Sequence, residues 1–306
     1  MDDWIDTVGM GWLPDLPDFR DYSVEHDEVS DRFKLLGETD SIKAMLETVG
    51  VGAGQKVKLP ATADLRGFCS KIENQQTLGS CTAQAGVGLV EYFQRRASGK
   101  YIDGSRLFLY KATRNLMKLT GDTGAYLRTT MAALVLFGVP PEEYWPYRVP
   151  DFDVEPPAFC YSFAQNYQAI RYYRLDPPGT DKVTVLPGRV KSLLAAGLPS
   201  IFGFTVFSSI SQASGDGEIP YPTDKERVKG GHAVMAVGYD DGKKIENDLG
   251  GAPTVGALLI RNSWGEGWGM KGYGWLPYKY VETGLAIDWW SLIKCEWVDT
   301  GTFGLQ

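Results

Sequence analysis

The chain changes the spacing of its apolar residues about halfway along, and this change limits the folds that it can adopt. Apolar and small residues recur at helical spacing in three stretches, residues 81–96, 105–119 and 127–137. After Pro157, short runs of strand-forming residues follow at 169–175, 200–207, 233–239, 257–261 and 272–276. Helices come first, and strands separated by turns follow them. This order predicts an α+β protein of two lobes, with an antiparallel sheet in its second half.

Size and charge restrict the classes of partner. With 306 residues, of which 43% are hydrophobic and 12% aromatic, the chain can divide a large core between two lobes. Its net charge of −7 repels phosphate backbones and anionic lipids, so we expect neither nucleic acid nor membrane as a partner. The first residues are acidic where a signal peptide needs basic and then apolar residues, and no apolar run can span a bilayer. We therefore expect a soluble, cytoplasmic protein.

The cysteines and histidines are too few and too scattered to suggest a metal site. The four cysteines form no CxxC pair, and only His26 and His232 are available beside them. We expect neither a metal nor an organic cofactor. If Cys81 is catalytic, at most one disulfide can form among the other three, and Cys160 and Cys295 are expected to be small buried hydrophobic residues.

The first 58 residues differ from the rest in being acidic and proline-rich, with one modest helical pattern at residues 41–49. The glycines between Gly50 and Gly54 indicate a linker. A phosphate loop, the other structure in which such glycines occur, requires a strand before them and a lysine-serine pair after them, and the chain has neither there. The chain is thus divided into an extension (1–58), a mostly helical lobe that carries a candidate nucleophile (59–156) and an antiparallel β lobe (157–306).

Cys81 stands at the predicted start of a helix, directly after Gly79 and Ser80. Unpaired N–H groups and the positive end of the helix dipole at that place lower the pKa of a thiol and favour the thiolate. A buried structural cysteine is the alternative for a lone cysteine, but the downstream residues favour a nucleophile.

His232 opens an alternating run, 233–237, and a second run at 257–261 leads to Asn262. If the two runs pair as an antiparallel hairpin with Tyr239 near Gly256, the register brings His232 close to Asn262. An asparagine oxygen can fix the tautomer of a histidine whose other nitrogen faces a nucleophile. The indoles of Trp264 and Trp268 follow directly and are expected to shield this contact from water.

These residues make the chain resemble the papain-like cysteine peptidases. Three blocks carry the resemblance, 74–83 with the cysteine, 230–234 with the histidine and 261–273 with the asparagine, and it spans residues 60 to 290. It implies a helical left lobe, a β-barrel-like right lobe and an active site in the cleft between them. It further implies that Gln75 and the backbone N–H of Cys81 hold the oxyanion. The residues that it places beside a peptide or protein substrate are Gly79, Gly124, Ala125, Gly231, Ala233 and Trp264.

The chain departs from the family pattern at several positions. Leu78 stands where the family has a cysteine, Thr82 where it has an aromatic residue, and Asp122 where it has the partner cysteine, so one family disulfide is lost from both ends. Ala125 replaces a frequent glycine, which leaves the shape of the second substrate subsite open. In the family, the segment before the mature enzyme often crosses the cleft as an inhibitor. Residues 1–58 are therefore either such a segment, in a self-inhibited precursor, or a plain extension.

The expected reaction is peptide-bond hydrolysis by a thiolate–imidazolium pair of Cys81 and His232, through an acyl-enzyme intermediate. One alternative is a glutamine amidotransferase, but those sites need glycine and glutamate where this chain has Ala83 and Val234. The other is a catalytically silent binding protein on a peptidase fold, which would not require Cys81, His232, Asn262 and Gln75 together.

Overall fold

The computed structural model describes residues 7–29, 34, 39–51, 58–167, 171–183 and 185–293. The helices in chain order are α2 (Ile42–Thr48), α3 (Cys81–Ser98), α4 (Arg106–Met117), α5 (Leu127–Leu136), α6 (Ala158–Ala164), α7 (Val185–Ala195) and α8 (Tyr278–Glu282). The strands are β1 (Trp12–Leu13), β2 (Thr62–Asp64), β3 (Ala125–Tyr126), β4 (Arg171–Arg174), β5 (Ser200–Phe207), β6 (Val228–Ile245), β7 (Thr254–Arg261), β8 (Tyr273–Pro277) and β9 (Ala286–Ile293).

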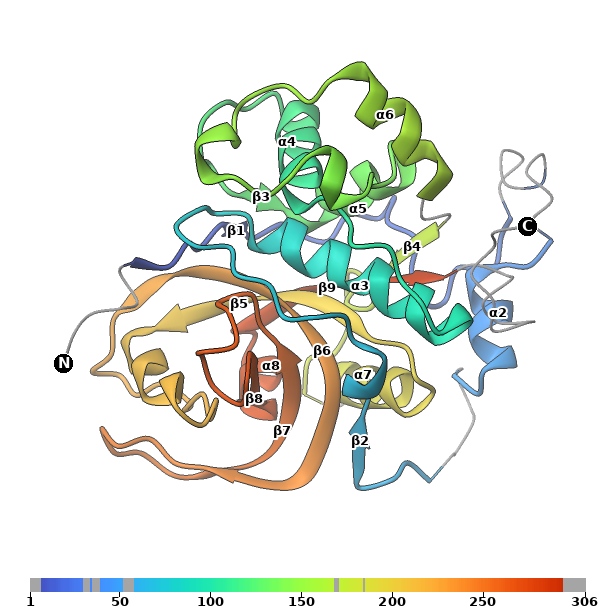
Figure 1. The fold of residues 1–306 in the computed structure, drawn as a ribbon. Helices are drawn as coiled ribbons and strands as arrows, with labels where there is room; N and C mark the ends of the chain where they lie inside the picture. The colour runs from blue at the N-terminus through green and yellow to red at the C-terminus, as the bar shows by residue number, and fades with distance from the viewer. Residues whose placement is uncertain are drawn as a thin grey trace.

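Helices and strands separate into two lobes, as the sequence predicted. Helices α4, α5 and α6 gather at the top of the view, the strands fill the lower half, and α3 runs between them (Figure 1). Seven strands form one sheet in the order β4-β9-β5-β6-β7-β8, with β2 beside β6. All pairs in this sheet are antiparallel, whereas β1 and β3 form a separate parallel pair.

Helix α3 is the central element because both lobes pack on it. Its residues from Cys81 to Gln94 are buried, and it ends at Gly99, whose φ of +73° is a left-handed value that glycine adopts without strain. Gly88 leaves room on α3 for Arg261 of β7, since a Cβ there would lie 2.3 Å from the guanidinium Nη1. The helix that begins at the candidate nucleophile is therefore fixed against the strand that leads to Asn262.

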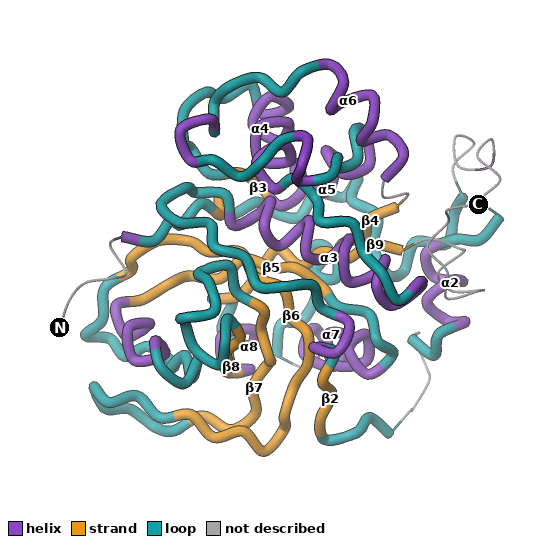
Figure 2. The backbone as a smooth tube through the Cα atoms, viewed as in Figure 1, coloured by secondary structure: helices purple, strands orange, loops and turns teal. Residues whose placement is uncertain are grey.

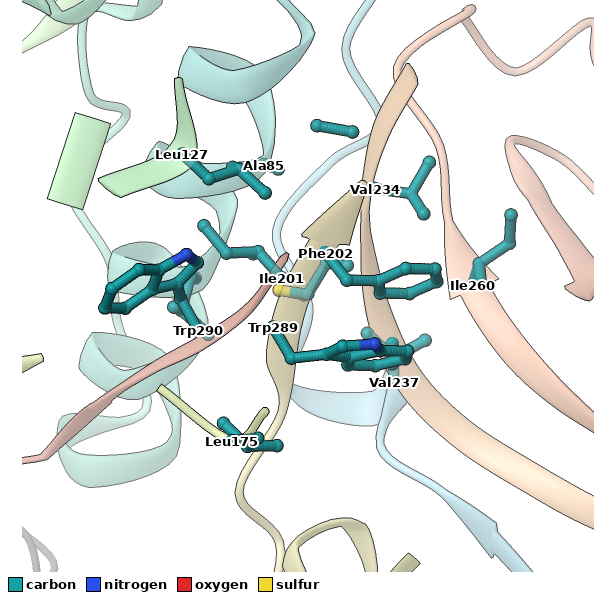
Figure 3. Close-up of a cluster of buried hydrophobic side chains, with 14 of the residues drawn as sticks. Ala85, Leu127, Leu175, Ile201, Phe202, Val234, Val237, Ile260, Trp289 and Trp290 are labelled. Atoms are coloured by element: carbon teal, nitrogen blue, oxygen red, sulfur yellow. The ribbon is translucent and has the colours of Figure 1, made fainter. Parts of the chain in front are cut away.

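The core of the β lobe is aromatic. The rings of Phe202 on β5 and Trp289 on β9 stack with centroids 3.9 Å apart, and Figure 3 shows Val234 and Ile260 beside them. Because β5 lies between β6 and β9, this packing fixes the three strands relative to one another. Cys160 of α6 is fully buried, as expected, in a smaller cluster with Ala164 and with Phe108 and Ala112 of α4, so the helical lobe extends beyond the predicted boundary at residue 156.

The three predicted helices correspond to α3, α4 and α5, the pattern at 41–49 to α2, and the run at 200–207 to β5. The predicted register between the histidine and asparagine strands was wrong by two residues. Tyr239 pairs with Leu258 rather than Gly256, and a bulge between Ala236 and Gly238 accounts for one residue of this shift. The hairpin is also longer than predicted, and Figure 2 shows β6 and β7 running side by side toward the bottom of the view.

Helix α7 and strand β9 are among the elements that were not predicted. Helix α7 carries Pro187 and Gly188 in its first turn, where proline is tolerated although it breaks a sequence pattern. Strand β9 contains Asp288, whose φ of +65° interrupts the strand geometry as its charge interrupts the apolar alternation. Gly52 to Gly54 of the expected linker, and Cys295, lie outside the described residues. Among the described residues, Cys69, Cys81 and Cys160 are free thiols.

A buried ion pair fixes α3 to α4. The Nη2 of Arg106 donates to both oxygens of Glu91, at 3.0 and 2.9 Å, and each side chain is only 1% exposed. The same carboxylate accepts from Ser70 Oγ at 2.5 Å and from Gly104 N at 3.0 Å. Because four hydrogen bonds converge on it, this charge is satisfied in a place where an unpaired one is strongly disfavoured.

We expect Glu91→Gln to lower the free energy of unfolding by about 3 kcal/mol, because the buried Arg106 loses the most deeply buried of its anionic partners and keeps only the partly exposed Asp103 and Glu73. The matched control is Glu246→Gln in the exposed pair with Lys244, which is expected to leave stability unchanged. Urea unfolding of both variants measures the difference. Equal stabilities would contradict a stabilising role for the buried pair.

Candidate active site

Cys81 is the first residue of α3, and its side chain is completely buried. Ser80 precedes it without capping the helix through its side chain, so the N–H groups of the first turn are left for the sulfur. The backbone N–H groups of Ala233, Gly11, Thr82 and Cys81 favour the thiolate. Burial nevertheless outweighs them and raises the pKa of the Cys81 thiol to about 11. The expectation of a lowered pKa is therefore wrong for this state of the molecule.

His232 and Asn262 meet as the hairpin argument predicted, although the register differs. His232 Nε2 lies 2.7 Å from Asn262 Oδ1, and both side chains are buried. The same oxygen accepts from Ser263 N at 2.8 Å, which identifies Nε2–H as the donor to it. The buried Nδ1 has no hydrogen-bond partner among the described residues. His232 thus carries a basic nitrogen that no described group occupies.

Burial acts on this histidine as it acts on the cysteine. It lowers the pKa of His232 to about 4, against the hydrogen bond to Asn262, which raises it. The indole of Trp264 stacks on the imidazole with centroids 4.4 Å apart, and Trp268 meets Trp264 edge to face at 5.5 Å. The indole of Trp264 therefore covers the imidazole and Trp268 packs behind it, and the cysteine and histidine are both neutral at pH 7 in this state.

Gln75 joins the loop before α3 to the loop after β7. Its Oε1 accepts from Ser263 Oγ at 2.6 Å, and its backbone N donates to Ser263 O at 2.9 Å. Its Nε2 donates to the carbonyl oxygens of Leu78 and Gly9, both at 2.8 Å. The amide nitrogen that the family resemblance assigns to an oxyanion is thus directed at a backbone carbonyl of the N-terminal segment.

Asp122 occupies the place of the lost disulfide and forms hydrogen bonds there. Its two carboxylate oxygens accept from Gly79 N at 3.0 and 3.1 Å. Tyr110 donates its hydroxyl hydrogen to Asp122 at 2.5 Å, and its hydroxyl oxygen accepts from Gly124 N at 3.1 Å. The loop that carries Cys81 is therefore joined to the loop of Gly124 and Ala125 without a covalent bond.

Residues 9–13, here called the arm, lie on the sites predicted to contact substrate. Gly11 O accepts from Ala125 N at 2.7 Å, and Trp12 and Leu13 pair with Ala125 and Tyr126 as parallel strands. Figure 1 shows this N-terminal segment passing between β3 and the sheet. The fit is tight, since a Cβ on Gly11 would lie 1.8 Å from Gly79 O. A Cβ on Gly124 would lie 2.3 Å from Gly11 O, and one on Gly231 would lie 2.6 Å from Trp12 O.

The described part of the chain offers neither a metal site nor a membrane-spanning helix. No three or more His, Cys, Asp or Glu side chains are grouped there as a metal site requires. No helix there combines the length and apolar character needed to cross a membrane.

Comparison with known proteins agrees with this geometry. The family model for the papain family cysteine protease matches residues 59–289. The chain belongs to the papain family. As a papain-family protein it is a cysteine peptidase, and its two lobes form the fold of that family.

Relatives share most of the length of the chain. A peptidase C1-like protein of Acanthamoeba polyphaga mimivirus is 32% identical over 288 residues, 92% of this chain and 86% of the viral protein. Cathepsin K of Mus musculus is 27% identical over 224 residues, 72% of this chain and 60% of the cathepsin. The crystal structure of xylellain, a cysteine protease from Xylella fastidiosa, is similar with a TM-score of 0.70 and 30% identity, covering 94% of this chain and 96% of xylellain.

Sequence reasoning missed Trp12, Ser263 and the contacts of Gly11. Only one signal pointed to the arm, the alternation of Gly9 and Gly11 with bulky residues, which is typical of backbone that approaches other backbone closely. Ser263 carried no signal of its own, because its role depends on Gln75, which is 188 residues away in the chain.

The buried thiol gives a test of the closed state, by which we mean the state described here, with the arm in place and Cys81 buried. With a pKa of about 11, on the order of 10⁻⁴ of the Cys81 side chains are ionised at pH 7, and the fraction grows as the pH rises toward 11. We expect the rate of alkylation by iodoacetamide to rise about tenfold per pH unit between pH 6 and pH 10 in the intact chain. A Cys81→Ala variant gives the background from the other cysteines. A rate that levels off below pH 7 would contradict the closed state.

Proposed function

We propose that the chain hydrolyses peptide bonds with Cys81 as nucleophile, His232 as acid and base, and Asn262 as the residue that orients His232. The observation that carries the proposal is the pairing of His232 with Asn262, which leaves Nδ1 as a free base. The residue that follows, Ala233, directs its N–H to the sulfur of Cys81. Hydrolysis by a thiol needs a nucleophile, a base and a group that orients the base. This chain supplies them from three separate elements.

The reaction proceeds in two halves. The Cys81 proton passes to His232 Nδ1, and the sulfur bonds to the substrate carbonyl carbon, whose oxygen accepts from Gln75 Nε2 and the Cys81 backbone N–H. The C–N bond then breaks as His232 returns the proton to the leaving amine, and a thioester remains. Water attacks the thioester, His232 takes the proton of the water, and the carboxylic acid leaves as the thiol forms again.

We further propose that the described chain is a self-inhibited form. The arm supports this, because Gly9 O accepts from the nitrogen that would bind an oxyanion and Gly11 O accepts from Ala125 N. Beyond the cleft, Arg128 anchors the segment that follows the arm. It pairs with Asp15 and, at 2.8 Å, with Asp21. With the arm in place no substrate backbone can pair with Ala125.

The arm also explains why neither catalytic group is charged. It is one of the elements that exclude water from Cys81 and His232, and exclusion of water disfavours both the thiolate and the imidazolium. Displacing the arm would readmit water and allow the proton to move from sulfur to nitrogen. In this proposal, inhibition acts on the charge state as well as on access to the site.

In the Trp12→Ala background, which loosens the arm, replacing Cys81 by alanine is expected to reduce hydrolysis of peptide substrates to background, a loss of at least about 10³-fold, because no other group can form the thioester. A thiol-directed epoxide should label Cys81 in that background and leave the Cys81→Ala variant unlabelled there. The matched control, Cys160→Ala, removes a buried thiol outside the site and should keep both properties. Undiminished hydrolysis by the Cys81 variant would reject the proposal.

Weakening the arm is expected to raise activity. Trp12 is 5% exposed and fixes the arm to the β lobe, so we expect the full-length Trp12→Ala variant to hydrolyse peptides with a kcat/KM at least about tenfold higher. Phe19→Ala is the matched control, because this side chain of the same segment is 88% exposed. If both variants keep the parent rate, the arm is no inhibitor.

A further inference from the structure

The indole of Trp12 fills a slot on the surface of the sheet beside Cys81. Gly203 of β5 and Gly231 of β6 form its walls. A Cβ on Gly203 would lie 1.9 Å from Cε2 of Trp12, and one on Gly231 would lie 2.8 Å from Cε3. Because both positions lack side chains, the slot has the width of an aromatic ring.

A buried carboxylate forms the end of this slot. Trp12 Nε1 donates to Asp288 Oδ2 at 3.0 Å, and Asp288 is 0% exposed. The other oxygen, Oδ1, accepts from Trp290 Nε1 at 2.7 Å and lies 3.3 Å from Arg174 Nη1. Asp288 thus has one oxygen fixed by the protein and one directed at the occupant of the slot.

The slot lies next to the nucleophile along the arm. Gly11, the residue before Trp12, directs its N–H to the Cys81 sulfur and accepts from Ala125 N. Strands β6, β5 and β9 are consecutive in the sheet, so Gly231, Gly203 and Asp288 line one continuous surface from His232 outward. Any peptide that replaces the arm on Ala125 must present a side chain to this surface.

We propose that the slot, once Trp12 has left it, binds a substrate side chain, and that Asp288 makes the enzyme select tryptophan there. This inference rests on the proposed function and adds its substrate class. A ring without a donor would displace water from Asp288 Oδ2 and return no hydrogen bond, so a buried acceptor would be left unsatisfied. Tryptophan fills the same width and supplies the N–H.

The test uses the full-length Trp12→Ala variant and fluorogenic peptides that differ in one residue. Tryptophan is compared with 3-benzothienylalanine, which has the same shape but sulfur in place of N–H, at each of the three positions before the scissile bond. We expect kcat/KM to be at least about tenfold higher for tryptophan at one of these positions. Equal values at all three positions, in an enzyme that cleaves the peptides, would overturn the inference and leave the proposed function standing.

Two further substitutions in the same background locate the preference. In Asp288→Asn the amide oxygen is expected to face Trp290 and Arg174, which directs NH₂ into the slot and abolishes the preference. Asparagine tolerates the left-handed backbone at this position. Gly203→Ala narrows the slot, and the three atoms nearest its added Cβ all belong to Trp12, which this background lacks. It should lower the rate for both aromatic peptides. An unchanged preference in Asp288→Asn, or unchanged rates for both peptides in Gly203→Ala, would contradict the assignment.

A binding measurement separates the slot from catalysis. In full-length Trp12→Ala, free indole is expected to bind at least about tenfold more tightly than benzothiophene, measured by calorimetry, and Asp288→Asn should remove the difference. This result is independent of peptide hydrolysis. If no peptide is cleaved but indole is still preferred, the proposed function fails while the slot is upheld. Equal binding of both rings overturns the slot.

Discussion

The backbone hydrogen bonds between the arm and the cleft determine the state of the whole site. Gly9 and Gly11 offer carbonyl oxygens to Gln75 Nε2 and Ala125 N, and these bonds hold the arm against Cys81. The sulfur and the imidazole are both buried in this form, and burial moves their pKa values apart until both groups are neutral. In the proposed self-inhibited form, access, protonation and the use of Gln75 Nε2 as an oxyanion donor would therefore change together when the arm leaves.

The proposed catalytic groups come from both lobes, so their geometry depends on how the lobes are joined. Arg261 donates to Ser70 Oγ at 3.0 Å, and Ser70 donates to Glu91 on α3, which connects the asparagine loop to the nucleophile helix. On the other side of Cys81, Asp122 connects Gly79 to the loop of Ala125. These polar contacts are buried, where each is stronger than in water and intolerant of a missing partner. The Arg261 contacts hold β7 against α3, and the Asp122 contacts hold Cys81 beside the loop of Ala125 within the helical lobe, where the family has a disulfide.

The sequence predicted those features that depend on local pattern. Helices α3 to α5, strand β5 and the meeting of His232 with Asn262 follow from periodicity and spacing. The register failed because a bulge beside Val237 cannot be read from an alternating apolar run. Strand β9 was missed because the charged Asp288 interrupts its run of apolar residues, and a φ of +65° is not a strand geometry. The pKa of Cys81 was mispredicted because burial of the sulfur in the folded chain is a tertiary effect that no local motif encodes.

The direction of the arm explains why a segment in contact with the nucleophile is not itself an electrophile. Because β1 runs parallel to β3, the arm passes the sulfur with the Gly11 N–H directed at it, while the neighbouring carbonyls face Gln75 and Ala125. A thiolate attacks a carbonyl carbon, and a donor N–H instead binds the sulfur without a reaction path. The oxyanion donor and the nucleophile are thus engaged by different peptide groups, Gly9 O and Gly11 N–H. In a productive substrate, a single carbonyl group places its carbon at the sulfur and its oxygen at the proposed oxyanion donor. The arm in this orientation has no carbonyl group that does both.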